Sequence, residues 1–243
     1  MSEAVLSKAE EHLAAGDSAA AERALSAEWR DIKTAPAEAK HAMAMVRAHQ
    51  KRFADAEQLL RGALTDEPQS LRHNIALGHI LTLSENPTKA SEAYAAAYRI
   101  DPEWPGLLNN YVTACYGAGR YDEAEKGARL MITKAPTAGA WDLLSCSLRG
   151  QGRAQEALDA ANEALRVSPE HLGARHSLGA ALLKLGRASE ALTAFDQVEA
   201  SGGSGAALSF NRAAALEKLG KSKEAKAVLE DAARRWPNAK RPN

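Results

Sequence analysis

The stretch Gly119-Arg120-Tyr121-Asp122-Glu123-Ala124 is one copy of a short pattern that returns along the whole chain. Its last residue belongs to a set of seven alanines that follow one another at intervals of 33 to 35 residues: Ala21, Ala56, Ala90, Ala124, Ala157, Ala191 and Ala225. A fixed period near 34 residues is typical of stacked helix–turn–helix repeats. The sequence therefore predicts an α-solenoid, in which each repeat packs mainly on its neighbours.

Alignment on these alanines divides the chain into seven repeats, which we predict to form a single solenoid over 1–243. The repeats are 2–36, 37–70, 71–104, 105–137, 138–171, 172–205 and 206–239. Five of them carry a glycine five residues before the alanine, where a left-handed backbone can end the first helix: Gly16, Gly119, Gly152, Gly186 and Gly220. Repeats two and three have Lys51 and Glu85 there, and we expect Asn86 to adopt the left-handed conformation in repeat three.

The composition agrees with closely packed helices. Hydrophobic residues make up 45% of the chain and aromatic residues only 5%, and alanine, the best helix former, dominates the apolar set. No sustained alternation of β-branched residues indicates a strand. Prolines near the end of several repeats set the length of the second helix: Pro68, Pro102, Pro136, Pro169 and Pro237. The predicted fold class is all-α.

This pattern resembles the tetratricopeptide repeat (TPR) family, and the resemblance covers essentially the whole chain. Repeat five carries residues at the family's characteristic places, namely Trp141, Leu144, Ala157, Ala164 and Pro169. The resemblance implies a right-handed superhelix whose first helices line a concave groove. In this family the groove usually binds extended peptides or helices of partner proteins.

Groove positions are those places on the first helices that do not carry small packing residues. In the middle of the chain they are Arg72, His79, Asn109, Asn110, Thr113, Tyr116, Asp142, Arg149 and His176. This mixture of amide, aromatic and charged groups suits an extended peptide. We therefore predict a non-enzymatic scaffold or adaptor that holds a peptide or a partner protein, of unknown identity, in the groove.

Two known uses of the family can be compared with these residues. A clamp for a partner's C-terminal carboxylate needs paired lysines, but the corresponding places hold residues such as His41, Ile75 and Ala76. A ladder of asparagines, found in repeats attached to glycosyltransferases, is matched by Asn110 and Asn211 only in part. The alternative function is a substrate-docking module that serves a glycosyltransferase-type or sulfotransferase-type enzyme.

The sequence predicts no catalytic residue, metal site or cofactor. None of the seven histidines forms an HExxH pair, and His41 and His49 lie two helical turns apart, too far for one metal. Cys146 has no histidine nearby in sequence to act as a base. The segment 201–205 is rich in glycine but lacks the lysine of a phosphate-binding loop, so it is interpreted as a loop between repeats.

The last helix predicts a surface for assembly at the C-terminal end. Val228, Leu229 and Trp236 belong to an apolar stripe that no following repeat covers. We therefore predict weak homo-oligomer formation or partner docking here, and a self-assembling structural scaffold is the third interpretation. Residues 206–243 contain nine basic and four acidic side chains, a net charge of +5, which is interpreted as a solvated end.

The overall charge limits the classes of partner that we expect, and the cysteines indicate the cellular compartment. The chain has 31 basic and 31 acidic residues, so no net charge favours nucleic acid or an anionic membrane as a partner. Cys115 and Cys146 do not form a disulfide framework, which fits a reducing compartment. Without a secretory signal or a spanning segment, we expect a cytoplasmic protein, and the alanine richness indicates a bacterial source.

Overall fold

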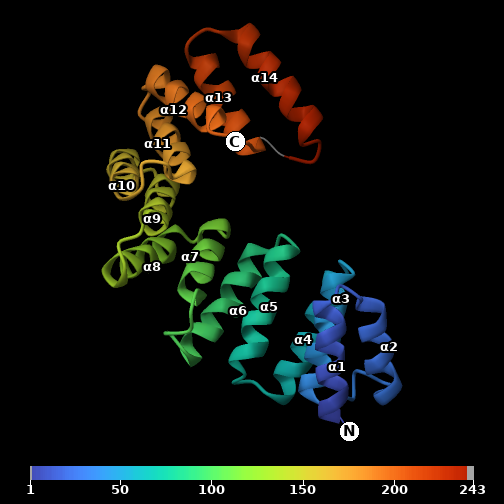
Figure 1. The fold of residues 1–243 in the computed structure, drawn as a ribbon. Coiled ribbons are helices and arrows are strands. Elements are labelled where there is room, and N and C mark those ends of the chain that lie inside the picture. The colour runs from blue at the N-terminus through green and yellow to red at the C-terminus, as the bar shows by residue number, and fades with distance from the viewer. Residues whose placement is uncertain (1, 240–243) are drawn as a thin grey trace. The chain divides into compact units, whose positions relative to one another are not determined.

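The computed structural model describes residues 2–239, which form fourteen α-helices and, within that range, no strand (Figure 1). This confirms the predicted all-α repeat fold. The chain divides into two compact units, one ending at Ala118 and the other beginning at Gly119. The division falls inside predicted repeat four, between its two helices. The prediction of a single solenoid over 1–243 stays a prediction.

The first unit contains three complete helix pairs and one further helix. They are α1 (Ser2–Ala14), α2 (Ser18–Glu28), α3 (Ala37–His49), α4 (Phe53–Asp66), α5 (Leu71–Leu83), α6 (Pro87–Ile100) and α7 (Leu107–Gly117). Each pair packs together, and α2 on α3 and α4 on α5 join one pair to the next. The first helices α1 and α3 are also in contact.

The second unit continues with one helix followed by three pairs. They are α8 (Tyr121–Lys134), α9 (Ala138–Gly150), α10 (Ala154–Val167), α11 (Leu172–Lys184), α12 (Ala188–Ala200), α13 (Ala206–Lys218) and α14 (Ser222–Arg235). Consecutive helices pack together, and the first helices α9, α11 and α13 also contact one another in sequence. No helix among residues 2–239 has the length and apolar content needed to cross a membrane.

The turns between paired helices adopt the left-handed backbone that the glycines predicted. Gly16, Gly119, Gly152, Gly186 and Gly220 have φ between 74° and 81°. In repeats two and three, Lys51 (φ 61°) and Glu85 (φ 56°) adopt this conformation themselves. The expectation for Asn86 is wrong, because its φ is −112° and it caps α6 instead. Pro87 follows Asn86, and the residue before a proline is disfavoured in compact helical conformations.

The second helices begin with a recurrent ion pair. A basic residue stands at the N-cap and pairs with an acidic residue three positions later. The pairs are Arg52–Asp55, Arg120–Glu123, Arg153–Glu156, Arg187–Glu190 and Lys221–Glu224. The carboxylate lies in the first turn, where the helix dipole favours negative charge.

The helices of each repeat interlock through small residues. All seven periodic alanines are at most 2% exposed. Each first helix also has a packing position that is occupied in most repeats by a small residue. The residue 16 positions later lies on the second helix of the same repeat, and its size varies from repeat to repeat. The successive combinations are Ala9 and Leu25, Ala44 and Leu60, Gly78 and Tyr94, Val112 and Ala128, Ser145 and Ala161, Gly179 and Phe195, and Ala213 and Leu229. The smallest first-helix residue, glycine, is combined with an aromatic ring, and the larger Val112 with an alanine.

Candidate partner-binding groove

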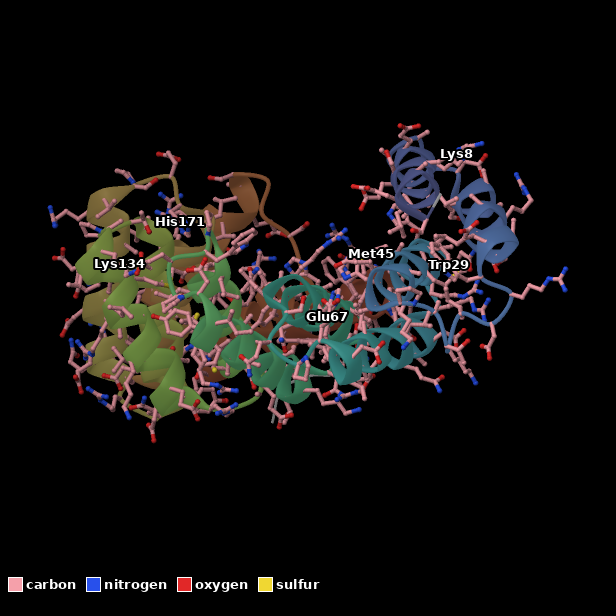
Figure 2. The ribbon with its side chains drawn as sticks, turned by 90° about the horizontal axis from the view of Figure 1, so that it is seen from below. Lys8, Trp29, Met45, Glu67, Lys134 and His171 are labelled. Atoms are coloured by element: carbon pink, nitrogen blue, oxygen red, sulfur yellow. The ribbon has the colours of Figure 1, made fainter. Side chains whose placement is uncertain are left out.

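A cavity of about 790 Å³ opens between the first helices of repeats two and three, α3 and α5. Most of its lining is apolar: Met45, Ala48, Leu71, Ile75, Ala76, Ile80, Leu83 and Trp104. Four polar residues also line it: His41, His49, Arg72 and His79. Met45, on the α3 side, is labelled in Figure 2. The volume lies within the range typical of ligand-binding pockets.

Helical spacing explains how the two walls form. On α5, Leu71, Ile75, His79 and Leu83 follow one another at intervals of four residues, so they share one face of the helix. On α3, His41, Met45 and His49 have the same spacing. The cavity is therefore bounded by the faces of two helices that belong to successive repeats.

Two large apolar side chains of this groove face water. Leu83 is 59% exposed and Trp104 is 48% exposed. Trp104 comes from the segment between α6 and α7, so the lining is not confined to the two helices. Exposed apolar surface gathered at a concave site is characteristic of a place where a partner binds.

Arg72 and His79 are the two residues of the predicted site that line this groove. Arg72 is exposed, and its guanidinium donates to Glu38 at 2.5 Å and to Glu10 at 2.8 Å. The ring of His79 lies edge-on to that of Tyr94, with centroids 5.8 Å apart. Partial burial lowers the pKa of His79, which keeps its imidazole neutral at pH 7.

His41, which lines the groove, is paired with a fully buried histidine of α5, and sequence spacing does not reveal this pair. His41 of α3 and His73 of α5 approach to 3.0 Å between their Nδ1 atoms. Burial, followed by the positive charge of Arg72 and the neighbouring His73, lowers the pKa of His41 to about 3. His41 is therefore neutral at physiological pH and offers the groove a hydrogen-bonding ring without a charge.

Two further residues of the predicted site line a smaller pocket in the first unit. Asn110 and Thr113 of α7 line a space of about 420 Å³ together with Tyr94 and Pro87 of α6. The Asn110 amide nitrogen also lies 3.3 Å from Nε2 of His79. Of the other predicted residues of α7, Asn109 is exposed and Tyr116 is half-buried.

Asp142, Arg149 and His176 lie in the second unit, as a group distinct from the groove between α3 and α5. The Ser177 hydroxyl donates to Asp142 at 2.5 Å, and the Asn211 amide nitrogen lies 3.0 Å from Nε2 of His176. Burial raises the pKa of Asp142, while Ser177, His171 and Arg149 oppose that shift. These contacts connect α9, α11 and α13, so the side chains take part in contacts between repeats.

The environment of Cys146 opposes nucleophilic chemistry. Burial and the negative charge of Asp142 raise the pKa of its thiol. The Cys146 sulfur lies 3.4 Å from the Ser177 hydroxyl and 4.0 Å from the Asp142 carboxylate. A reactive cysteine needs the opposite setting, in which neighbouring cations stabilise the thiolate.

The residues predicted for end-on assembly are divided between two places. Val228 and Leu229 are half-buried against a small cluster formed by Ala213, Leu216 and Ala225. Trp236 instead lines a pocket of about 270 Å³ beside the 202–205 loop, with the Arg235 guanidinium 4.6 Å from its ring centroid. Assembly through this end stays a prediction.

The basic character of the last repeat is reduced by ion pairs. Arg212 binds Asp196 and Glu199, and Arg234 and Arg235 both contact Asp231. Lys240 and Arg241, which contribute to the charge of +5, lie outside the described residues.

Sequence reasoning missed the apolar part of the groove. Met45, Leu83 and Trp104 were not among the predicted site residues, because polar groove positions were preferred. A signal was present in the four-residue spacing of α5, where Leu83 extends the apolar face beyond the residues that pack inside the repeat.

The repeats, the turns and the groove place this chain in a known family. A tetratricopeptide repeat model matches residues 41–106 and 177–240, and a second model of the same description matches 148–204. The chain belongs to the tetratricopeptide repeat family. No curated protein matches it in sequence.

Several solved structures share the fold at low sequence identity. A tetratricopeptide repeat protein from Parabacteroides merdae is 16% identical, with a TM-score of 0.80 over 96% of this chain and 92% of that chain. A thermophilic TPR protein from Thermus thermophilus is 20% identical, with a TM-score of 0.62 over 70% and 93% of the two chains. PilF of Pseudomonas aeruginosa is also 20% identical, with a TM-score of 0.57 over 84% and 93%.

Proposed function

We propose that this protein is a non-enzymatic scaffold that binds a partner protein through the groove between α3 and α5. The family as a whole suggests a role in protein–protein interaction. The observation that carries the more specific proposal is the apolar cavity with Leu83 and Trp104 exposed at its edge.

The lining of the groove defines the chemistry of the segment that would bind. No acidic residue lines the cavity, whereas Arg72 and three histidines do. Apolar side chains of the partner would be buried against Met45, Ile75 and Leu83, which is favourable by about 25 cal/mol per Å² of apolar area. A backbone carbonyl of the partner would accept hydrogen bonds from the polar edge. The proposed ligand is therefore an apolar peptide segment with at least one acceptor group near Arg72.

The two asparagines of the partial ladder support this choice over docking of an enzyme's substrate. Asn110 lies against His79 and Asn211 against His176, at 3.3 Å and 3.0 Å respectively. These amide nitrogens face histidines of neighbouring repeats. They are consequently less suited to holding the backbone of an extended substrate.

The test is a selection of peptides from a random display library against the full chain, followed by affinity measurement with fluorescently labelled peptides. We expect the selected sequences to be apolar. The Leu83→Glu and Trp104→Ala variants should each weaken binding at least about tenfold, because each removes more than about 1.4 kcal/mol of apolar contact.

Matched controls come from exposed apolar residues of the second unit. Leu130 and Val167 are 38% and 42% exposed, and Leu130→Glu and Val167→Glu should leave the affinity unchanged. Peptides that bind all four variants as tightly as the original chain would show that the groove between α3 and α5 is not the binding site.

We further propose a reducing compartment such as the cytoplasm. The support is that the described residues contain no disulfide bond.

A further inference from the structure

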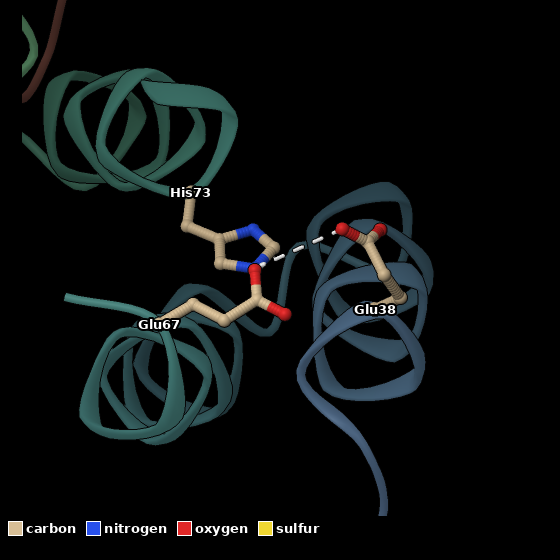
Figure 3. A group of neighbouring side chains, drawn as sticks. All are labelled: Glu38, Glu67 and His73. Carbon is tan, nitrogen blue, oxygen red and sulfur yellow. Dashed lines mark ion pairs between the residues drawn. The ribbon is translucent and has the colours of Figure 1, made fainter. Parts of the chain in front are cut away.

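A cluster of two carboxylates and a buried histidine lies next to His41 and Arg72 of the groove lining. Glu38 comes from the first turn of α3, Glu67 is the residue at the C-cap of α4, and His73 is in the first turn of α5. One ligand atom from each of the three lies within 4.8 Å of the others. Figure 3 shows the Glu67 carboxylate directed at the ring of His73, with Glu38 approaching from α3.

The central atom of the cluster is Nε2 of His73. The side chain of His73 is 0% exposed, and its buried Nε2 makes no hydrogen bond of normal geometry. Nε2 lies 3.3 Å from Oε2 of Glu67 and 4.0 Å from Oε1 of Glu38. In the tautomer that carries its proton on Nδ1, His73 presents a buried lone pair at Nε2 beside two carboxylates, and a bound cation would satisfy all three groups.

The separations match those between ligands of one metal ion. Ligand atoms about 2.1 Å from a tetrahedral zinc ion lie about 3.4 Å apart. The distance between His73 Nε2 and Glu67 is already close to this value at 3.3 Å, and Glu38 Oε1, at 4.0 Å from Nε2, would move closer on binding. The carboxylates of Glu38 and Glu67 are 41% and 50% exposed, so an ion has access from solvent.

Neighbouring side chains orient the proposed ligands through hydrogen bonds, as is usual in metal sites. Nδ1 of His73 lies 3.0 Å from Nδ1 of His41, so His73 can donate Nδ1–H to His41 and present a bare Nε2. Ligating histidines generally donate their second ring nitrogen to a partner in this way. Arg72 binds Oε2 of Glu38, which orients the carboxylate and leaves Oε1 directed at His73.

The charges of the cluster favour a divalent cation. Three carboxylates, those of Glu10, Glu38 and Glu67, gather here around one guanidinium, that of Arg72. One imidazole with two carboxylates suits zinc and manganese better than calcium or magnesium, because nitrogen is a poor ligand for the harder ions.

We propose that Glu38, Glu67 and His73 form a binding site for one divalent transition-metal ion, with Zn²⁺ as the first candidate. The site would join α3, the end of α4 and α5, and so fix one end of the groove. Three protein ligands leave a fourth position for water or for an acceptor group of a bound molecule. This proposal does not depend on the identity of the groove's partner.

The test uses the full chain, freed of metal with a chelator, and titration calorimetry with ZnCl₂ at pH 7. We expect one zinc ion per chain at this site. The Glu67→Gln and Glu38→Gln variants keep the side-chain size and should weaken binding by more than about tenfold. In the ¹⁵N-labelled protein, zinc should perturb the Nε2 resonance of His73 while Nδ1 remains protonated.

Two matched variants control for adventitious binding. Glu92→Gln alters an exposed carboxylate of α6, and His49→Gln removes an exposed groove histidine, and neither should change the affinity. Far-ultraviolet circular dichroism of each variant establishes that it is folded. The proposal is overturned if no zinc or manganese binds with a Kd below about 100 μM. It is equally overturned if binding depends on His49 but survives Glu67→Gln and Glu38→Gln.

Discussion

The ring of Tyr94 lies directly against Gly78, so that a Cβ atom added to Gly78 would be 2.5 Å from Cε1 of the ring. Tyr94 is 2% exposed and cannot move aside without disturbing the core between α5 and α6. Gly179 has the same relationship to Phe195 in the second unit, also at 2.5 Å. The same close approach therefore recurs in two separate repeats.

We expect Gly78→Ala to lower the free energy of unfolding by about 1–3 kcal/mol, as overpacking of a core usually does. Urea unfolding followed by circular dichroism measures this change. The control is Gly62→Ala in α4, whose new Cβ would be 3.6 Å from the Lys40 side chain, an ordinary contact. That variant should gain up to about 1 kcal/mol from helix propensity. Equal stability of the two variants would contradict the close packing of Gly78 on Tyr94.

The left-handed residues Lys51 and Glu85 should be improved by glycine. A residue with a Cβ atom is strained in this conformation by about 1–2 kcal/mol, of which the greater flexibility of unfolded glycine cancels a part. We therefore expect Lys51→Gly and Glu85→Gly each to raise the free energy of unfolding by about 0.5–1 kcal/mol. The reverse change, Gly119→Ala, should destabilise although no atom lies within 4 Å of the new Cβ. Destabilisation by both glycine variants would show that these turns are not left-handed.

The thiol of Cys146 should react slowly in the native protein. Burial and Asp142 raise its pKa, so little thiolate is present at pH 8, and Cys115 is fully buried. We expect a disulfide reagent such as Ellman's to modify both thiols slowly before urea is added and rapidly after it. Rapid modification of either thiol in the folded protein would contradict the raised pKa of Cys146 or the burial of Cys115.

Stability should fall in mild acid because of buried neutral histidines. Burial, and then the charge of Arg149, lowers the pKa of His176 to about 4. The unfolded chain binds a proton at this residue below pH 6.5 while the folded chain does not. The stabilisation is therefore complete above pH 6.5 and is lost as the pH falls toward 4, by up to about 1.4 kcal/mol per pH unit.

His41, whose pKa is lowered to about 3, adds a similar dependence in the first unit. Asp142 acts in the opposite direction, because its pKa is raised by burial. The measurement is urea unfolding at pH 7, 6 and 5. The His176→Gln variant keeps an acceptor for Asn211. In this variant the free energy of unfolding should depend less steeply on pH, by the slope that corresponds to about one bound proton. An unchanged slope in this variant would mean that His176 is protonated in the folded state.

The sequence was sufficient for the repeat architecture because its evidence is local and periodic. Glycine turns such as Gly119 and packing positions such as Ala124 return in register, and each satisfies a backbone or volume requirement within one repeat. The error at Asn86 came from giving weight to its preference for left-handed turns while neglecting Pro87, which restricts it.

The candidate sites were harder to predict because they depend on distances between repeats. Leu83 and Trp104 lie 21 positions apart in sequence but line one cavity. His41 and His73 are separated by 32 residues, and only the packing of α3 against α5 brings their Nδ1 atoms to 3.0 Å. Metal ligands on one helix are recognisable from their spacing, whereas Glu38, Glu67 and His73 come from three different helices.

The combinations of small and large residues within the repeats have a consequence for how the chain can evolve. The two positions of each combination fill the core between the two helices of a repeat. In one repeat a glycine, Gly78, is combined with the large ring of Tyr94, and in another the larger Val112 is combined with the small Ala128. A single mutation from one combination toward the other creates an overfilled or hollow intermediate. When genes of this kind recombine, proteins whose crossover point lies between two repeats should therefore stay folded. Proteins whose crossover point lies between the two helices of one repeat should be destabilised and eliminated by selection.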